Sequence, residues 1–141
     1  MPTSVAVPRE TAPGERRVAM EPGVAKRLKG AGVEVLLETG AGAQAYLPDA
    51  LFPEATIVGS AAEALSKAQV TLKVQPPSLE EVAALAEGSA LISFMYPHKN
   101  LEVVKALAER RITTFAIELL PRISRAQAMD ALSSQAAVGG Y

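Results

Sequence analysis

The chain has 141 residues, of which 49% are hydrophobic and 21% charged, a composition typical of one globular domain. Its 14 basic and 15 acidic residues give a net charge of −1, which argues against a nucleic-acid-binding protein, because phosphate contacts need a basic patch. With no cysteine and one histidine, disulfides and thiolate chemistry are excluded and no metal site is expected. The longest uncharged apolar stretch, GSALISFMYP, is far shorter than the roughly 20 residues that span a bilayer, so we predict no membrane span.

Short β-branched runs alternate with segments of helical periodicity along the chain. We predict strands over residues 5–7, 33–38, 55–58, 70–74, 90–96 and 112–120. We predict helices over residues 21–32, 60–68, 78–88 and 100–111, the last capped by Asn100. Ser60 with Glu63, and Ser78 with Glu81, have the spacing of capping boxes. This alternation predicts an α/β fold, a Rossmann-like or flavodoxin-like three-layer sandwich with a mostly parallel sheet.

The segment GAGAQA, residues 40–45, nearly fits the dinucleotide-binding fingerprint G-x-G-x-x-G/A. Its context departs from that motif, because Pro48 and Pro53 interrupt the region where a long helix should follow. No convincing strand ending in an acidic residue follows at the expected distance of about 20 residues. We therefore interpret this segment as a tight surface turn.

Polar residues follow several of the predicted strands. In the loop PRETAPGERRVAM, Arg16 or Arg17 has the chemistry to hold an anionic group, although a solvated charged loop explains the same residues. Lys73 stands inside an apolar strand, so its side chain should either point into a cleft at the strand end or extend past an edge. His98 follows the next strand in a turn, where a surface histidine without a role is favoured over an acid/base.

The segment PRISRAQAMDALSSQ, residues 121–135, is rich in hydrogen-bonding side chains. Ser124 and Gln127 form a further capping-box pattern, which predicts a helix from Arg125. The polar side chains that share one side of this helix, with an arginine before it, are Arg122, Gln127, Asp130 and Ser133 or Ser134. They suit either a flat polar group such as a carboxamide or a capped surface helix, and the local pattern slightly favours the surface helix.

This segment closely resembles one in the NAD(H)-binding component, domain I of the alpha subunit, of proton-translocating NAD(P) transhydrogenases. PRETAPGERRVAMEPGVAKRLKGAGVEVLLETGAG and ALSKAQVTLKVQPP resemble the same family and its relative, alanine dehydrogenase. The resemblance covers essentially the whole chain. It implies NAD(H) as the cofactor, with its nicotinamide end lined by Arg122, Gln127, Asp130 and Ser133.

The resemblance also implies an activity and partners. The activity is hydride transfer from NADH to NADP⁺, which is bound on another subunit, coupled to proton translocation by a membrane component. Hydride passes directly in this reaction, so no catalytic acid or base is expected. The implied partners are the other transhydrogenase subunits and a second copy of the chain, forming a homodimer. The implied location is cytoplasmic, peripheral on the membrane complex.

Two alternatives stay open. In an amino-acid dehydrogenase of the alanine dehydrogenase type, a loop arginine and a strand lysine, which fall at Arg17 and Lys73, hold the substrate carboxylate. The catalytic histidine of that enzyme follows the fifth strand, but His98 is displaced by a residue or two, so its role is not carried over. The other alternative is a non-enzymatic assembly module.

The resemblance also predicts the extent of the domain. Family members continue into a second α/β domain with the true Gly-rich fingerprint, so residues 1–141 are expected to be the N-terminal α/β half of domain I, cut from a longer chain. We expect weak or no NAD(H) binding by this piece alone, because most cofactor contacts would be missing. Without cofactor, Gln127 is predicted to close the capping box with Ser124.

Overall fold

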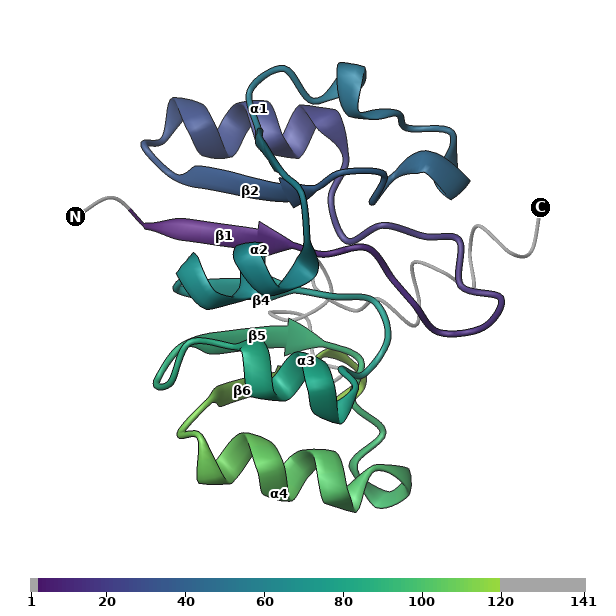
Figure 1. Ribbon diagram of the computed structural model, residues 1–141, viewed down its shortest axis with the longest axis vertical. Coiled ribbons are helices and arrows are strands. Elements are labelled where there is room, and N and C mark those ends of the chain that lie inside the picture. The colour runs from purple at the N-terminus through teal and green to yellow at the C-terminus, as the bar shows by residue number, and fades with distance from the viewer. Residues whose placement is uncertain (1–2, 120–141) are drawn as a thin grey trace, which may run out of the picture.

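A computed structural model describes residues 3–119, and Figure 1 shows their arrangement. Within these residues, six strands form one parallel sheet in the order β3-β2-β1-β4-β5-β6. The strands are β1 (Ser4–Val7), β2 (Glu34–Glu38), β3 (Thr56–Val58), β4 (Val70–Leu72), β5 (Ala90–Ser93) and β6 (Thr113–Ala116). The α-helices are α1 (Pro22–Gly30), α2 (Ala61–Lys67), α3 (Leu79–Ala84) and α4 (Leu101–Glu109). Short 3₁₀ helices are η1 (Ala43–Ala45), η2 (Asp49–Leu51), η3 (Pro97–Lys99) and η4 (Ile117–Leu119).

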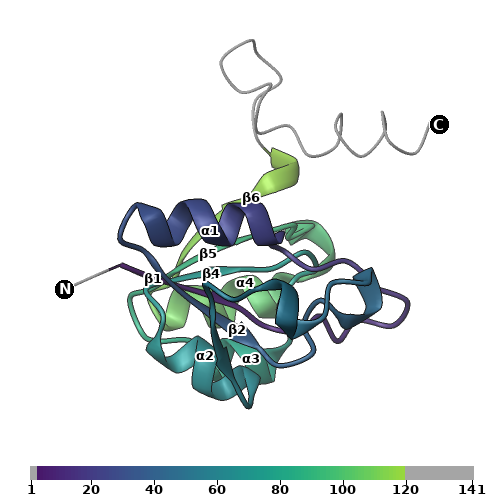
Figure 2. The same ribbon diagram turned by 90° about the horizontal axis from the view of Figure 1, so that it is seen from above.

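The helices cover the sheet from both sides, with α1 on one face and α2, α3 and α4 on the other (Figure 2). From β1 the chain builds the sheet outward in one direction through β2 and β3, and then in the other direction through β4, β5 and β6. The strand order therefore reverses between β1 and β4. This three-layer parallel arrangement confirms the predicted Rossmann-like α/β class.

Two apolar cores lie on the two faces of the sheet, and alternation along the strands fills both. Val5 and Val7 of β1 pack with Ala25 of α1, whereas Ala6 between them packs with Leu65 of α2 on the opposite face. All four residues of β1 are buried. A strand buried on both faces favours apolar residues at successive positions, as at Val5, Ala6 and Val7.

The predicted helix starts are only partly correct. Ser78 and Glu81 form the full reciprocal capping box at α3, whereas at α2 the Ser60 hydroxyl accepts from the Glu63 amide without a reciprocal bond. Asn100 does not cap α4 with its side chain, and its amide instead donates to the carbonyls of the preceding loop. That prediction was wrong because the loop backbone competes for the same side chain.

Three predicted strands are too long, because the chain leaves the sheet earlier than their apolar character suggests. β4 ends at Leu72, β5 at Ser93 and β6 at Ala116, where η4 follows directly. The residues beyond these strand ends lie at the carboxyl edge of the sheet, where the loops after all parallel strands meet. None of the helices in residues 3–119 has the length and apolar character needed to cross a membrane.

Apolar side chains form a row across one half of the sheet. Leu72, Ile92 and Phe115 are neighbours in register on β4, β5 and β6. Phe115 is 53% exposed, so the described residues leave this end of the row uncovered. The edge strand β6 therefore presents an apolar surface.

Leu65 lies at the centre of the α2–α4 core and is 1% exposed. We expect Leu65→Ala to lower the free energy of unfolding by about 2–5 kcal/mol, because it removes buried methyl groups and leaves a cavity. The matched change Leu101→Ala, at a position that is 70% exposed, should alter stability by less than about 0.5 kcal/mol. Urea denaturation followed by circular dichroism measures both, and equal effects would contradict this assignment of the core.

Candidate functional site

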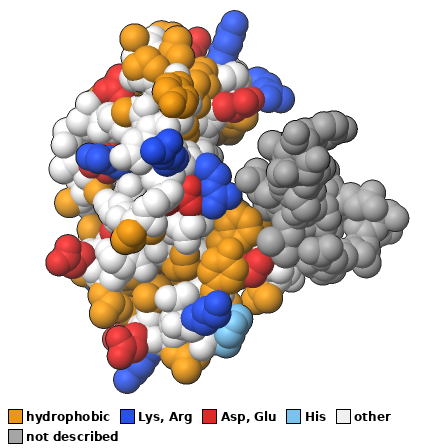
Figure 3. All heavy atoms as spheres, turned by 90° about the vertical axis from the view of Figure 1, so that its right-hand side faces the viewer, with side chains coloured by type: hydrophobic (Ala, Val, Ile, Leu, Met, Phe, Trp, Pro, Cys, Tyr) orange, Lys and Arg blue, Asp and Glu red, His pale blue; other side chains and the backbone are white. Residues whose placement is uncertain are grey.

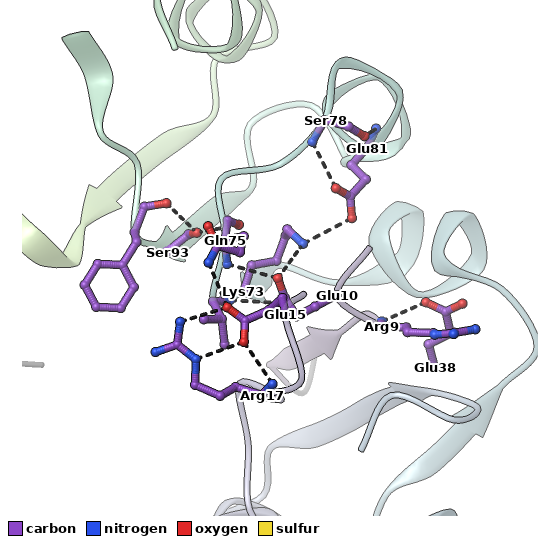
Figure 4. A network of polar contacts seen from close by, with 12 residues as sticks. Arg9, Glu10, Glu15, Arg17, Glu38, Lys73, Gln75, Ser78, Glu81 and Ser93 are labelled. Atoms are coloured by element: carbon purple, nitrogen blue, oxygen red, sulfur yellow. Dashed lines mark hydrogen bonds and ion pairs between the residues drawn. The ribbon is translucent and has the colours of Figure 1, made fainter. Parts of the chain in front are cut away.

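A polar network occupies the point where the strand order reverses. β1 and β4 are neighbours, and the loop after β1 meets the loop after β4 at the carboxyl edge of the sheet. In open parallel sheets, ligands bind in the crevice outside this reversal. The side chains of the network, drawn in Figure 4, are Glu10, Glu15, Arg17, Lys73, Gln75 and Glu81.

Lys73 is the first residue after β4 and is held between two carboxylates. Its Nζ lies 3.2 Å from Oε1 of Glu10 and 3.3 Å from Oε2 of Glu81, which belongs to α3. The side chains of Lys73 and Glu10 are each 2% exposed. Of the two placements predicted from the sequence, extension past an edge is wrong, because the ammonium is buried between two acidic partners that compensate its charge. Lys73 also lines a cleft at the strand end.

Glu10 joins the loop after β1 to the end of β4. One carboxylate oxygen accepts the Val74 amide at 2.9 Å, and the other accepts the Gln75 amide at 2.9 Å and the Lys73 ammonium. These amides need acceptors because the strand has ended and Pro76 follows. Glu10 was not among the residues predicted from the sequence, although an acidic residue three positions after a buried strand is a signal that could have found it.

Arg17 is held by Glu15 of the same loop. The Nε and Nη2 atoms of Arg17 donate to the two Glu15 oxygens at 2.9 and 2.8 Å, and the side-chain Nε2 of Gln75 donates to Oε1 of Glu15 at 2.7 Å. The Arg17 side chain is 47% exposed and that of Glu15 is 6% exposed. Hydrogen bonds from Arg17, and then from Gln75, outweigh burial and lower the pKa of Glu15 from 4.5 to about 2.

Arg17 also borders an apolar cleft. Its volume is about 400 Å³, within the range of small-molecule sites. The lining residues are Arg17, Val18, Ala19, Leu72, Lys73, Val74, Ile92, Phe94 and Ile117. Figure 3 views the carboxyl edge of the sheet, where charged side chains lie beside an apolar area. The cleft therefore offers apolar walls and one guanidinium, a combination that suits a flat organic ligand with a polar end.

The loop after β5 forms one wall of this cleft. The rings of Phe94 and Tyr96 stack with centroids 6.0 Å apart and planes inclined by 10°. His98 lies on η3 with an exposed side chain, and Arg16 is exposed in the β1 loop. Of the arginines considered from the sequence, Arg17 rather than Arg16 borders the cleft.

The GAGAQA segment forms a tight turn, as predicted. The Gly40 amide donates to Oδ1 of Asp49 at 2.9 Å, and η1 and η2 follow in place of a long helix. A Cβ at Gly42 would lie 2.4 Å from the carbonyl oxygen of Leu47, so glycine is needed there for the turn itself. The turn's own geometry therefore accounts for these glycines, and no pyrophosphate is needed to explain them.

The residues predicted to face the nicotinamide, Arg122, Gln127, Asp130 and Ser133, lie outside the described residues, as does the predicted Ser124–Gln127 capping box. Their placement stays a prediction. Among residues 3–119, no cluster of three or more histidine, aspartate or glutamate side chains could hold a metal ion.

The family model of the alanine dehydrogenase/PNT N-terminal domain matches residues 6–139. The chain belongs to this family. It is 48% identical to the first portion of the divided NAD(P) transhydrogenase subunit alpha of Rhodospirillum rubrum, over 97% of this chain and 38% of that protein. It is 32% identical to alanine dehydrogenase of Mycobacterium tuberculosis, over 97% of this chain and 39% of that protein.

Among solved structures, the transhydrogenase of Sinorhizobium meliloti superimposes with a TM-score of 0.92 at 42% identity, covering 98% of this chain and 42% of that one. The chain thus spans well under half the length of these relatives. The resemblance noted from the sequence is confirmed for both branches of the alanine dehydrogenase/PNT family, with the transhydrogenase branch the more similar.

Removal of the Lys73 ammonium should destabilise the fold strongly. We expect Lys73→Ala to lower the free energy of unfolding by about 3–5 kcal/mol, because Glu10 and Glu81 would be left as uncompensated charges with little access to water. The matched control is Lys67→Ala, which breaks an exposed ion pair with Glu63 and should cost less than about 0.5 kcal/mol. Urea denaturation at pH 7 measures both, and a Lys73 variant as stable as the control would refute the buried network.

The low pKa of Glu15 predicts a pH-dependent contribution to stability. Because the folded-state pKa of about 2 lies below the ordinary value of 4.5, the contribution is complete above the ordinary value and is lost as the pH falls through the folded-state pKa. Glu15→Gln should therefore lower stability by about 1–2 kcal/mol at pH 7. The difference from wild type should shrink as the pH falls from 4.5 towards 2. Urea titrations at several pH values test this, and a difference that is constant with pH would contradict it.

Proposed function

We propose that this chain is part of the NAD(H)-binding component of an NAD(P) transhydrogenase and helps to position NADH for hydride transfer to NADP⁺. The observation that carries the proposal is its 48% identity with a transhydrogenase alpha subunit over 97% of the chain. The motif RISRAQAMDALSSQ, which resembles the transhydrogenase segment and not that of alanine dehydrogenase, supports it. A cleft at the reversal of strand order, where parallel sheets bind their ligands, is consistent with it.

The residues proposed to face the nicotinamide are Arg122, Gln127, Asp130 and Ser133. An amide, a carboxylate, a hydroxyl and a guanidinium can together satisfy the donors and acceptors of a carboxamide. Direct hydride transfer needs the two nicotinamide rings in a defined geometry, so these groups supply orientation and electrostatics and no proton transfer. Lys73 and Arg17 act as supporting residues, because Lys73 joins the loop after β1 to α3 through Glu10 and Glu81, and Arg17 orients Glu15 within its own loop.

The described residues suit one end of the cofactor and not the whole of it. The apolar cleft beside Arg17 has room for a flat ring, whereas the glycine-rich turn uses its Gly40 amide for Asp49 and offers no phosphate cradle. We therefore propose that residues 1–141 form the first half of domain I and that a further Gly-rich domain supplies the pyrophosphate site. On this basis, residues 1–141 alone should bind NAD(H) weakly or not at all.

The assembly belongs to the same proposal. NADP(H) would bind on a partner subunit, a membrane component would couple hydride transfer to proton translocation, and the alpha subunit would form a homodimer. The chain would then lie on the cytoplasmic face of the membrane complex as a peripheral component. The name of the R. rubrum relative, which describes a portion of one subunit, supports a multi-subunit assembly.

The second candidate function is that of an amino-acid dehydrogenase of the alanine dehydrogenase type. It is favoured by the positions of Arg17 and Lys73, which match the carboxylate-binding pair of that enzyme. The geometry speaks against it, because the Lys73 ammonium already contacts two carboxylates and Arg17 is held by Glu15. NAD(H)-dependent interconversion of alanine and pyruvate by the full-length protein would favour this second function.

Substitution of the nicotinamide-facing residues should slow hydride transfer far more than it disturbs folding. In the full-length subunit assembled with its partners, Gln127→Ala or Arg122→Ala should lower the single-turnover transfer rate by about ten- to a hundredfold, because a misplacement of about 1 Å can cost that much. The melting temperature should change little.

Gln44→Ala and Arg27→Ala, the same changes at exposed positions of η1 and α1, are the controls and should leave the rate unchanged. Near-normal transfer in both site variants would refute the assignment of the site. Absence of transhydrogenation by the wild-type assembly would refute the proposed function.

A further inference from the structure

Glu118 accepts a set of hydrogen bonds that have no part in the proposed function. It lies on η4, directly after β6, and its carboxylate accepts hydrogen bonds from the loop after β5. The Met95 amide lies 3.0 Å from both carboxylate oxygens, and the Tyr96 amide lies 2.9 Å from Oε1. One side chain thus holds two consecutive backbone N–H groups of a neighbouring loop.

Asn100 holds the carbonyl groups of the same two residues. Its side-chain amide donates to the Met95 oxygen at 2.9 Å and to the Tyr96 oxygen at 3.2 Å. These backbone groups lie beyond the end of β5 and have no strand to pair with. Glu118 and Asn100 therefore take the place of ladder bonds at Met95 and Tyr96, and the Tyr96 carbonyl also accepts the Lys99 amide at 2.9 Å.

The loop needs this support because Tyr96 has a strained backbone. Its φ of 44° and ψ of 60° place it in the left-handed region, which costs a residue with a Cβ free energy. Glycine would adopt the same conformation without strain, so the tyrosine ring has a purpose at this position. The ring stacks on Phe94, which lines the cleft together with Arg17 and Ile117.

We propose that Glu118 is a positioning residue that fixes the Phe94–Tyr96 wall of the cleft relative to the polypeptide leading to the nicotinamide-facing residues. Glu118 stands four positions before Arg122, so the clamp on the loop and the proposed site share one short stretch of chain. Loss of the carboxylate would release the loop after β5, and with it the Phe94–Tyr96 wall of the cleft, from η4. This inference rests on the proposed function for its effect on hydride transfer, whereas the clamp itself is a property of this chain.

Glu118→Ala in the full-length subunit, assembled with its partners, tests the proposal. We expect the single-turnover rate of hydride transfer to fall about tenfold or more, while the Kd for NADH changes less than about threefold. The reason is that the variant would misalign the bound nicotinamide without removing a contact to NADH. Glu118→Gln keeps an acceptor oxygen and should restore most of the rate. The control Glu109→Ala removes an exposed carboxylate at the end of α4 and should behave as wild type.

Hydrogen exchange of the Met95 and Tyr96 amides separates the clamp from the function. In Glu118→Ala these two amides should exchange about tenfold faster, with protection in β1 and β4 unchanged, because only their acceptor is lost. Unchanged exchange would overturn the clamp whatever the enzyme does. Faster exchange with a wild-type transfer rate, or a rate lost only in proportion to folded protein, would overturn the positioning role. If the alanine variant does not fold, Glu118→Leu tests the same prediction. Wild-type exchange at both amides, or a wild-type transfer rate, in Glu118→Leu would overturn the proposal.

Discussion

The buried contact between Glu10 and Lys73 holds the carboxyl edge of this domain together. Two charges at 2% exposure are costly unless each is paired and hydrogen-bonded, and here the pair is completed by Glu81 and by the amides of Val74 and Gln75. The contact joins the β1 loop, the end of β4 and the start of α3. The strand order reverses at this place, so the contact lies where open parallel sheets bind their ligands, and Lys73 itself lines the cleft.

Carboxylates serve the same purpose at more than one strand end. Glu10 accepts the amides of two residues after β4, and Glu118 accepts the amides of two residues after β5. Parallel strands that end early leave N–H groups without partners, and an acidic side chain from the adjacent loop is a compact acceptor for two of them. Acidic residues that a sequence reading assigns to a solvated surface are therefore part of the framework of this edge.

The ion pairs at the carboxyl edge of the sheet bear on how one fold serves both transhydrogenases and alanine dehydrogenases. Arg17 and Lys73 fall in sequence patterns shared by transhydrogenases and alanine dehydrogenases, and both are held by acidic residues here. A cation that is already paired with a protein carboxylate binds a substrate carboxylate less strongly. The features that distinguish the two branches of the family are then expected in other segments, and RISRAQAMDALSSQ is the strongest candidate in this chain.

The sequence by itself determined the alternation of strands and helices, the capping box of Ser78 and Glu81, and the turn at GAGAQA, because periodicity, caps and turns depend on residues a few positions apart. Family likeness, and not local pattern, selected Arg122, Gln127, Asp130 and Ser133 as a site. Only the tertiary structure decided that Lys73 faces Glu10, that Asn100 holds a loop instead of a helix, and that strands end early. Glu10 and Lys73 are 63 positions apart and meet only because β4 inserts beside β1, an outcome of sheet order that no local pattern encodes.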